Sequence, residues 1–161
     1  MSTNARLYIL VGLSFVLAIA GSIVPLTGVI EPFRPAWPAL VLLFWTLHYP
    51  HRVGITTAWL VGLFLDVIHG GLLGQYPLAL AVLAYLALRL HQRIVVFPLW
   101  QQAISVGTLL AIYMTIILWI DGMTGRAPGS WLYWLPLLTS SLFWPVVHTV
   151  LTVTRRLLRI Y

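Results

Sequence analysis

The residues best suited to chemistry lie in the stretch 62–74, where one acid stands among apolar side chains. Asp66 precedes His69 by three residues, a spacing that would place both on one helix face and would suit a proton relay or a metal. Two ligands do not make a metal site, and no third follows at a suitable spacing. Asp66 therefore has three interpretations: a structural or subunit contact, a ligand or ion site, or a cap at a helix end formed by Gly70 and Gly71.

Small residues surround this acid at regular spacing. Gly62, Asp66, Gly70 and Gly74 recur every four residues, so on one continuous helix they would share a face. Small residues let helix backbones approach closely inside a membrane. The pattern predicts a helix-packing seam or a partner contact made by these four residues.

The signatures of intramembrane enzymes are missing from the sequence. The single Glu31 has no flanking histidines of the kind that a zinc protease needs, and no Gly-x-Ser-Gly turn is present. Asp66 lies inside one apolar segment and Asp121 lies in or beside a loop, so the two do not form the paired carboxylates of an aspartyl protease. We therefore expect no catalysis, no metal and no cofactor. The alternative is a small-molecule binding or transport module with a polar pocket around Asp66.

Composition places these residues in a membrane. The 161 residues are 61% hydrophobic and 7% charged, whereas soluble domains are about 25% charged. Mean hydropathy is +0.98. We expect one all-α, polytopic transmembrane domain over residues 1–161, with six helices near 7–25, 36–49, 54–69, 76–90, 98–120 and 131–153. The second segment is short, about 21 Å against a hydrocarbon core of about 30 Å, and could be a short span or a re-entrant hairpin.

The formal charge of +6 indicates how the chain is oriented in the membrane rather than binding to nucleic acid, because arginines at the ends of apolar helices follow the positive-inside rule. With six spans and a cytoplasmic N-terminus, seven arginines face the cytoplasm and two face out. Five spans with an outer N-terminus give the same bias, so either count places the C-terminus in the cytoplasm. The expected cytoplasmic anchors, which would meet lipid headgroups or a partner, are Arg89, Arg93, Arg155, Arg156 and Arg159.

Two sequence blocks carry a family resemblance. Phe33-Arg34-Pro35-Ala36-Trp37 and Pro50-His51-Arg52-Val53-Gly54, at their mutual spacing, closely resemble the MreD family of rod shape-determining proteins from Gram-negative bacteria. Further matching positions extend the resemblance over roughly residues 30 to 150, among them Gly62, Asp66, Gly70, Gly74 and Trp144.

The resemblance implies a non-enzymatic role in cell elongation at the inner membrane. Members of the family sit with MreC in the Rod complex, which joins MreB filaments, the RodA polymerase and a class B penicillin-binding transpeptidase. The family fold is similar to the six-helix substrate-binding subunits of energy-coupling-factor transporters, which favours six spans and a cytoplasmic N-terminus. We expect apolar helix faces to bind MreC, lipids and a second copy of the chain. The contact candidates are Arg34, Trp37, Pro50, His51 and Arg52.

Overall fold

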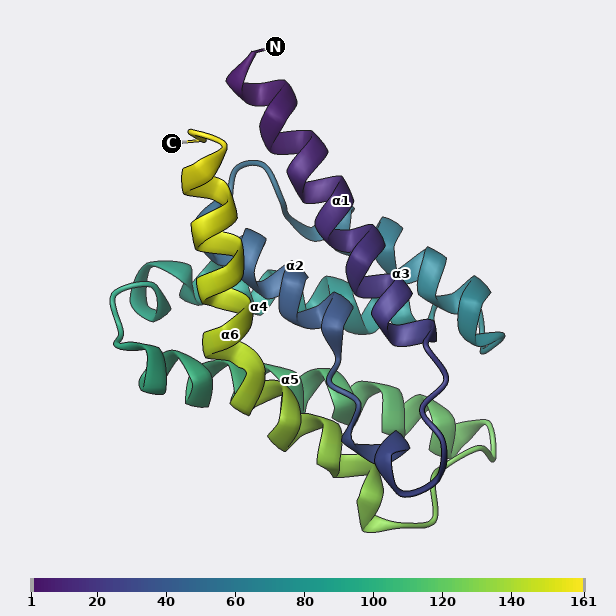
Figure 1. Ribbon diagram of the computed structural model, residues 1–161. Coiled ribbons are helices and arrows are strands. Elements are labelled where there is room, and N and C mark those ends of the chain that lie inside the picture. The colour runs from purple at the N-terminus through teal and green to yellow at the C-terminus, as the bar shows by residue number, and fades with distance from the viewer. Residues whose placement is uncertain (1, 161) are drawn as a thin grey trace.

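Six α-helices make up most of the molecule in a computed structural model that describes residues 2–160 (Figure 1). They are α1 (Thr3–Ile23), α2 (Trp37–His48), α3 (Ile55–His69), α4 (Gln75–Ile94), α5 (Leu99–Met123) and α6 (Leu135–Leu157). Short 3-10 helices, η1 (Gly28–Phe33) and η2 (Trp131–Trp134), precede α2 and α6. No strand occurs between residues 2 and 160. The predicted all-α, six-helix fold is confirmed.

Three helical stretches are long and apolar enough to cross a membrane: Thr3–Ile23, Leu99–Met123 and Trp131–Leu157. Helix α3 is also apolar but shorter. Helix α4 has 20 residues, yet its last turns carry Arg89, His91 and Arg93, which make it less apolar. These lengths agree with the integral membrane protein that the composition predicts.

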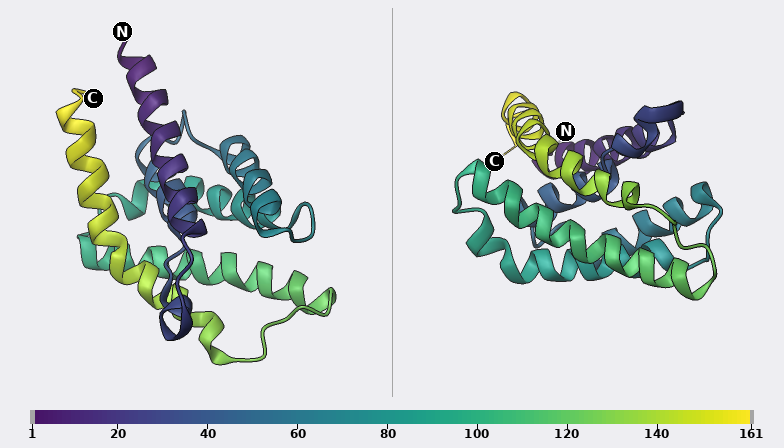
Figure 2. Two further views of the ribbon diagram at one scale, coloured as in Figure 1. Left: turned by 45° about the vertical axis from the view of Figure 1, so that its right-hand side comes forward. Right: turned by 90° about the horizontal axis from the view of Figure 1, so that it is seen from below.

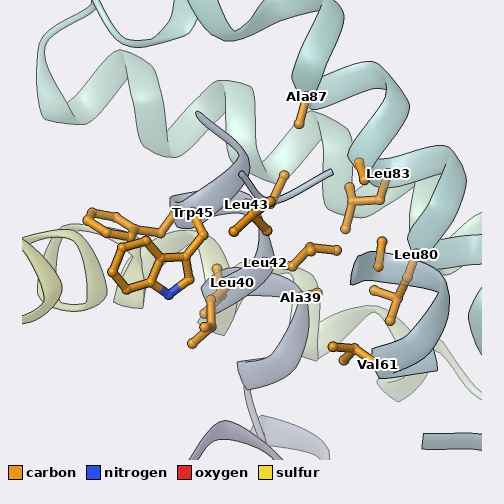
Figure 3. Close-up of a cluster of buried hydrophobic side chains, with 14 of the residues drawn as sticks. Ala39, Leu40, Leu42, Leu43, Trp45, Val61, Leu80, Leu83 and Ala87 are labelled. Carbon is orange, nitrogen blue, oxygen red and sulfur yellow. The ribbon is translucent and has the colours of Figure 1, made fainter. Parts of the chain in front are cut away.

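Helix α2 forms the centre of the fold. It packs against α1, α4 and α6, and ten of its 12 residues are buried, from Pro38 to Leu47. Figure 3 shows α2 leucines meeting Leu80, Leu83 and Ala87 of α4. At a rise of about 1.5 Å per residue, α2 is about 18 Å long, well short of a bilayer core of about 30 Å. Helices α1, α4 and α6 thus surround the short segment that was expected to be either a short span or a re-entrant hairpin.

The remaining helices lie on two sides of this central element. Seen from below, α1 and α6 lie on one side of α2, and α4 and α5 lie on the other (Figure 2, right). Helix α3 packs chiefly on α4. Helix α1 begins, and α6 ends, at the same end of the molecule (Figure 1).

Buried polar side chains tie these layers together. The indole Nε1 of Trp45 on α2 donates to the Ser14 hydroxyl of α1 at 2.8 Å. The indole Nε1 of Trp144 on α6 donates to the Gln102 side-chain oxygen of α5 at 3.3 Å. The Gln102 amide nitrogen in turn donates to the Phe97 carbonyl at 3.1 Å, in the α4–α5 turn. Each apolar layer thus carries a few directional bonds that fix its position.

Candidate functional site

Asp66 caps the helix that follows its own. Its side chain is 1% exposed, and one carboxylate oxygen accepts from the backbone N–H of Gly74 at 2.6 Å. The other oxygen accepts from the backbone N–H of Tyr76 at 3.0 Å. Gly74 is the N-cap residue of α4 and makes no side-chain cap of its own. The acid of α3 therefore supplies the cap that α4 lacks.

This arrangement offsets the burial of the Asp66 charge. The first N–H groups of a helix have no partner inside the helix, and its N-terminus carries a partial positive charge. A carboxylate that accepts two such N–H groups makes charge-assisted hydrogen bonds, which are stronger than neutral ones. Asp66 therefore makes a structural contact. It caps the start of α4 rather than the helix end at Gly70 and Gly71, and it fastens the end of α3 to the start of α4.

Gly62 lies where α3 and α4 touch backbone to backbone. A Cβ atom at this position would lie 2.4 Å from the Cα of Pro77 and 2.5 Å from its nitrogen. No larger residue fits there unless the helices separate. Gly62 thus stands one turn before Asp66, and the two residues hold the same helix pair together by contact and by hydrogen bonds.

Gly70 and Gly74 do not continue this helical face. Helix α3 ends at His69, and Gly70 adopts a left-handed conformation with φ of 60°. Gly74 also has a positive φ, 102°, and immediately precedes α4. The four-residue spacing therefore spans a helix, a turn and a helix start rather than one continuous face. The role of these residues as a partner contact stays a prediction.

His69 does not pair with Asp66. Its Nδ1 lies 2.9 Å from the carbonyl oxygen of Leu65, and its ring stacks on Tyr76 with centroids 4.9 Å apart. Within the part of the chain that the structure describes, no three potential metal-ligating side chains come together. The side chains of Asp66 and His69 are thus engaged separately, without the relay that their spacing would allow.

Arg34, in the first of the two sequence blocks, closes the C-terminal end of α1. Its guanidinium donates to the carbonyl oxygen of Ser22 at 2.6 Å and also to that of Val24. The last carbonyls of a helix have no partner inside the helix and carry partial negative charge, so a cation is stabilising there. Arg34 thus ties the segment before α2 to the end of α1.

The neighbouring residues of this block reach both α1 and α6. The backbone N–H of Ala36 donates to the Ser140 hydroxyl of α6 at 2.9 Å. The indole of Trp37 meets the Phe143 ring edge-on with centroids 5.5 Å apart. It also lies against Gly21, where a Cβ would come within 3.2 Å of the indole. Trp37 therefore fills the space between the two helices.

The second block holds the opposite end of α1. Arg52, in the loop between α2 and α3, donates to the Asn4 side-chain oxygen at 2.8 Å. Its guanidinium also lies over the Tyr8 ring at 5.7 Å. Pro50 and His51 form the turn that presents Arg52, and His51 is exposed. The arginines of the two blocks thus bind the two ends of the first helix.

The expected cytoplasmic anchors lie on α4 and at the end of α6. Arg89, Arg93, Arg156 and Arg159 are exposed, and the Arg89 guanidinium lies 5.3 Å from the Tyr85 ring centre. Arg155 is half-buried and lies over Tyr49 at 5.7 Å. Their contact with lipid or partner stays a prediction.

A cavity of about 280 Å³ lies beside the Arg34 cap. Its wall includes Glu31, Arg34, His69, Tyr76 and Tyr133. Asp66 is not part of this wall, because its carboxylate points to the start of α4. The Nε of Arg34 is buried without a hydrogen-bond partner. The polar groups that line this cavity therefore come from Ser22, Glu31, Arg34, His69 and three tyrosines rather than from Asp66.

Sequence reasoning missed four buried polar residues that join helices, one of which is Ser14, the acceptor of the Trp45 indole N–H. The Gln75 amide nitrogen donates to the Asp121 carboxylate at 2.9 Å, which joins the start of α4 to the end of α5. Gln102 and Ser140 bond to Trp144 and Ala36 as described above. A polar side chain inside an apolar helix was the available signal, because such residues in membranes face a partner or the bundle interior.

The chain is similar to known proteins over nearly its whole length. A family model described as rod shape-determining protein MreD matches residues 3–153. The chain belongs to the MreD family. It is 29% identical over 147 residues to the rod shape-determining protein MreD of Haemophilus influenzae, a match that covers 91% of each chain. The resemblance carried by the two sequence blocks is confirmed.

The MreD family consists of rod shape-determining proteins and is not a known enzyme family. No solved structure matches the chain. The expected likeness to the subunits of energy-coupling-factor transporters stays a prediction.

Proposed function

We propose that this chain is a non-enzymatic inner-membrane subunit of the Rod complex, which binds MreC and helps to position peptidoglycan synthesis. Membership of the MreD family is the observation that carries the proposal. In this role the chain provides a firm membrane platform, and its working parts are helix faces rather than a reaction centre.

The internal clamps support a platform role. The bonds of Asp66, Arg34 and Arg52 all join one part of the chain to another. Arg34 and Arg52 belong to the two blocks that carry the family resemblance, and Asp66 is a further matching position. The polar groups of all three residues hold helix ends in place. A scaffold needs such fixed helix ends, because partners in a membrane recognise shape through close packing.

The outer helix faces offer the area for partner contact. Helix α1 exposes Ile9, Val16 and Leu17, and α3 exposes Phe64 and Val67. Exposed apolar side chains of this kind suit lipid or the transmembrane helix of MreC equally well. Association would rest on close packing and a few interhelical hydrogen bonds, each contributing about 0.5 to 2 kcal/mol.

A six-span orientation with both termini in the cytoplasm fits this role. The start of α1 and the end of α6 lie at the same end of the molecule (Figure 1), as an even number of crossings requires. Arg6 and Arg156 belong to these terminal helices, Arg159 follows the end of α6, and Arg52 belongs to the loop bonded to α1. The positive-inside rule assigns that end to the cytoplasm.

Depletion and co-purification test the proposal. Depletion of the chain in its native organism should convert rods to spheres, and MreC should co-purify with the tagged chain from native membranes in mild detergent. Cells that keep their rod shape after complete depletion would contradict the proposal. Loss of MreC from the purified chain, with the chain itself still folded, would contradict direct binding.

Site-specific photo-crosslinking can then locate the contact. A crosslinking residue placed at Val16, Phe64, Trp119 or Val146 samples one exposed face of α1, α3, α5 or α6 respectively. We expect at least one face to crosslink to MreC, and a product of twice the chain mass would identify self-association. Gly129, in the loop before η2, is the control position outside the helices. Crosslinks at none of the four faces would refute a contact through the helix faces.

The alternative is a small-molecule binding or transport module built around Asp66. Both carboxylate oxygens of Asp66 accept backbone N–H groups, and the residue lies outside the cavity wall. This geometry favours the adaptor. A ligand bound in the 280 Å³ cavity, and lost on substitution of Asp66, would instead support the module.

A further inference from the structure

A groove opens between the first and last helices, at the end where the chain starts and finishes. It has a volume of about 540 Å³. Its floor is apolar and includes Ile9, Leu13, Leu157 and Leu158, whereas Arg6 and Arg159 supply its only charges among the lining residues of the described chain. The groove therefore combines two guanidinium groups with a surface that fits hydrocarbon.

The charge distribution around this groove is one-sided. The three acids of the chain are Glu31, Asp66 and Asp121. Glu31 lines the cavity beside Tyr76, Asp66 accepts from Tyr76 and Asp121 accepts from Gln75. All three therefore gather where α4 begins, away from the groove. No acidic side chain of this protein is available there to neutralise Arg6 or Arg159.

Arg159, which lines the groove, has a backbone conformation that is uncommon for a residue other than glycine. It has a φ of 52° and is the one residue other than glycine with a positive φ between residues 2 and 160. Its N–H donates to the Arg156 carbonyl at 3.0 Å, and the Ile160 N–H donates to the Arg155 carbonyl at 3.1 Å. This is the Schellman ending of a helix, in which the left-handed position is usually glycine. An arginine at that position points to a use for its side chain.

Ile160 fixes this turn in place. The residue is 3% exposed and belongs to the hydrophobic core. Because Ile160 is anchored in the core and Leu158 ends α6, Arg159 is held at the groove rather than on a loose tail. The arginine and the apolar floor are therefore parts of one fixed structure.

We propose that this groove binds one anionic glycerophospholipid. The phosphate lies between Arg6 and Arg159, and one acyl chain lies along the apolar floor formed by α1 and α6. Guanidinium groups match phosphate oxygens in a two-pronged geometry, and basic pockets between transmembrane helices suit anionic headgroups. A partner helix would use the apolar floor but has no need of two uncompensated arginines. The proposal requires only that the chain is embedded in a membrane.

Native mass spectrometry of the purified full-length chain, titrated with phosphatidylglycerol, tests this assignment. The double variant Arg6→Gln/Arg159→Gly removes both charges, and glycine preserves the left-handed turn. We expect a loss of affinity of about 30-fold, from the typical contribution of two arginines to binding of an anionic headgroup. The control Arg126→Gln removes one exposed charge from the loop after α5 and should leave the affinity within about twofold. A loss in the control as large as that in the double variant would overturn a specific site.

Two further measurements separate the lipid from other occupants. Leu13→Trp fills the groove while leaving both arginines, so it should also abolish lipid binding; unchanged binding would overturn the acyl-chain contact. Millimolar inorganic phosphate should not displace the lipid, and full displacement would mean a phosphate site without an acyl component. If Leu13→Trp removes a co-purifying protein and leaves lipid binding intact, the groove seats a partner helix and the lipid assignment is wrong.

Discussion

Replacement of Asp66 by asparagine tests the clamp between α3 and α4 most directly. The carboxylate accepts two backbone N–H groups, from Gly74 and Tyr76, one on each oxygen. An asparagine side chain keeps one oxygen but turns the other acceptor into an NH₂ group, which faces an N–H donor and cannot bond to it. The substitution thus preserves shape and volume while it removes one hydrogen bond and the negative charge.

The expected loss follows from these two terms. A buried donor left without its partner costs about 1 to 3 kcal/mol, and loss of a charge at a helix N-terminus costs up to about 1 kcal/mol more in ordinary geometries. We therefore expect Asp66→Asn to lower the free energy of unfolding by about 1 to 4 kcal/mol. Leu73→Ala is the control, because this side chain is 76% exposed in the same turn, and surface changes usually stay within about 0.5 kcal/mol.

Unfolding of the purified chain in mixed micelles of increasing SDS content measures both variants. Helicity and the fluorescence of the eight tryptophans report the transition. Cross-linking yield with MreC gives a functional readout on the same samples. Equal stability of Asp66→Asn and Leu73→Ala would refute the reasoning, because the capping bonds would then contribute nothing that a surface leucine does not.

Three further predictions concern helix contact, the α1–α2 bond and orientation. Gly62→Ala should lower the free energy of unfolding by about 1 to 3 kcal/mol, because its methyl group would clash with Pro77. The control Gly12→Ala has open space around it and should raise the free energy of unfolding by up to about 1 kcal/mol. Unfolding in SDS compares the two variants, and a change of the same sign in both would contradict the contact. Trp45→Phe should lower the free energy of unfolding by about 1 to 3 kcal/mol, because the Ser14 hydroxyl loses the indole donor and the smaller side chain leaves space unfilled. In the same assay, the double variant Trp45→Phe/Ser14→Ala should lose less stability than the sum of the losses in the two single variants. Reporters fused to each end of the chain should both give cytoplasmic signals, and an outer signal at the N-terminus would exclude six spans.

Helix positions were accessible from the sequence because runs of apolar residues, separated by proline, glycine and charged residues, mark the helices of a membrane chain. The segment predicted at 54–69 appears as α3 over Ile55–His69, and the segment predicted at 36–49 appears as α2 over Trp37–His48. The start of α1 extends to Thr3, since Ser2 caps it through its hydroxyl. A search for apolar runs does not detect a polar first turn, so α1 begins at Thr3 rather than at the predicted residue 7.

Partners of the polar groups were not accessible in the same way. The sequence singled out Asp66, but its bonds go to backbone groups eight and ten residues later, across a turn whose path depends on Gly70 and Gly74. Arg34 likewise bonds to carbonyls of α1 that no residue type announces. Backbone N–H and C=O groups are nearly the same in every residue, so the sequence does not show which of them a polar side chain contacts. The path of the chain through space decides that.

The enclosed position of α2 has a consequence for how the protein is made. Its neighbours in the fold are α1, α4 and α6, of which the last two are synthesised after it. A helix about 18 Å long emerges from the ribosome too short to hold itself across a bilayer, and its intended surroundings arrive only as the last helix is completed. Maturation of the chain is therefore a late event that needs all six helices. Chains shortened before α6 should be removed by membrane proteases rather than accumulate as partly active forms.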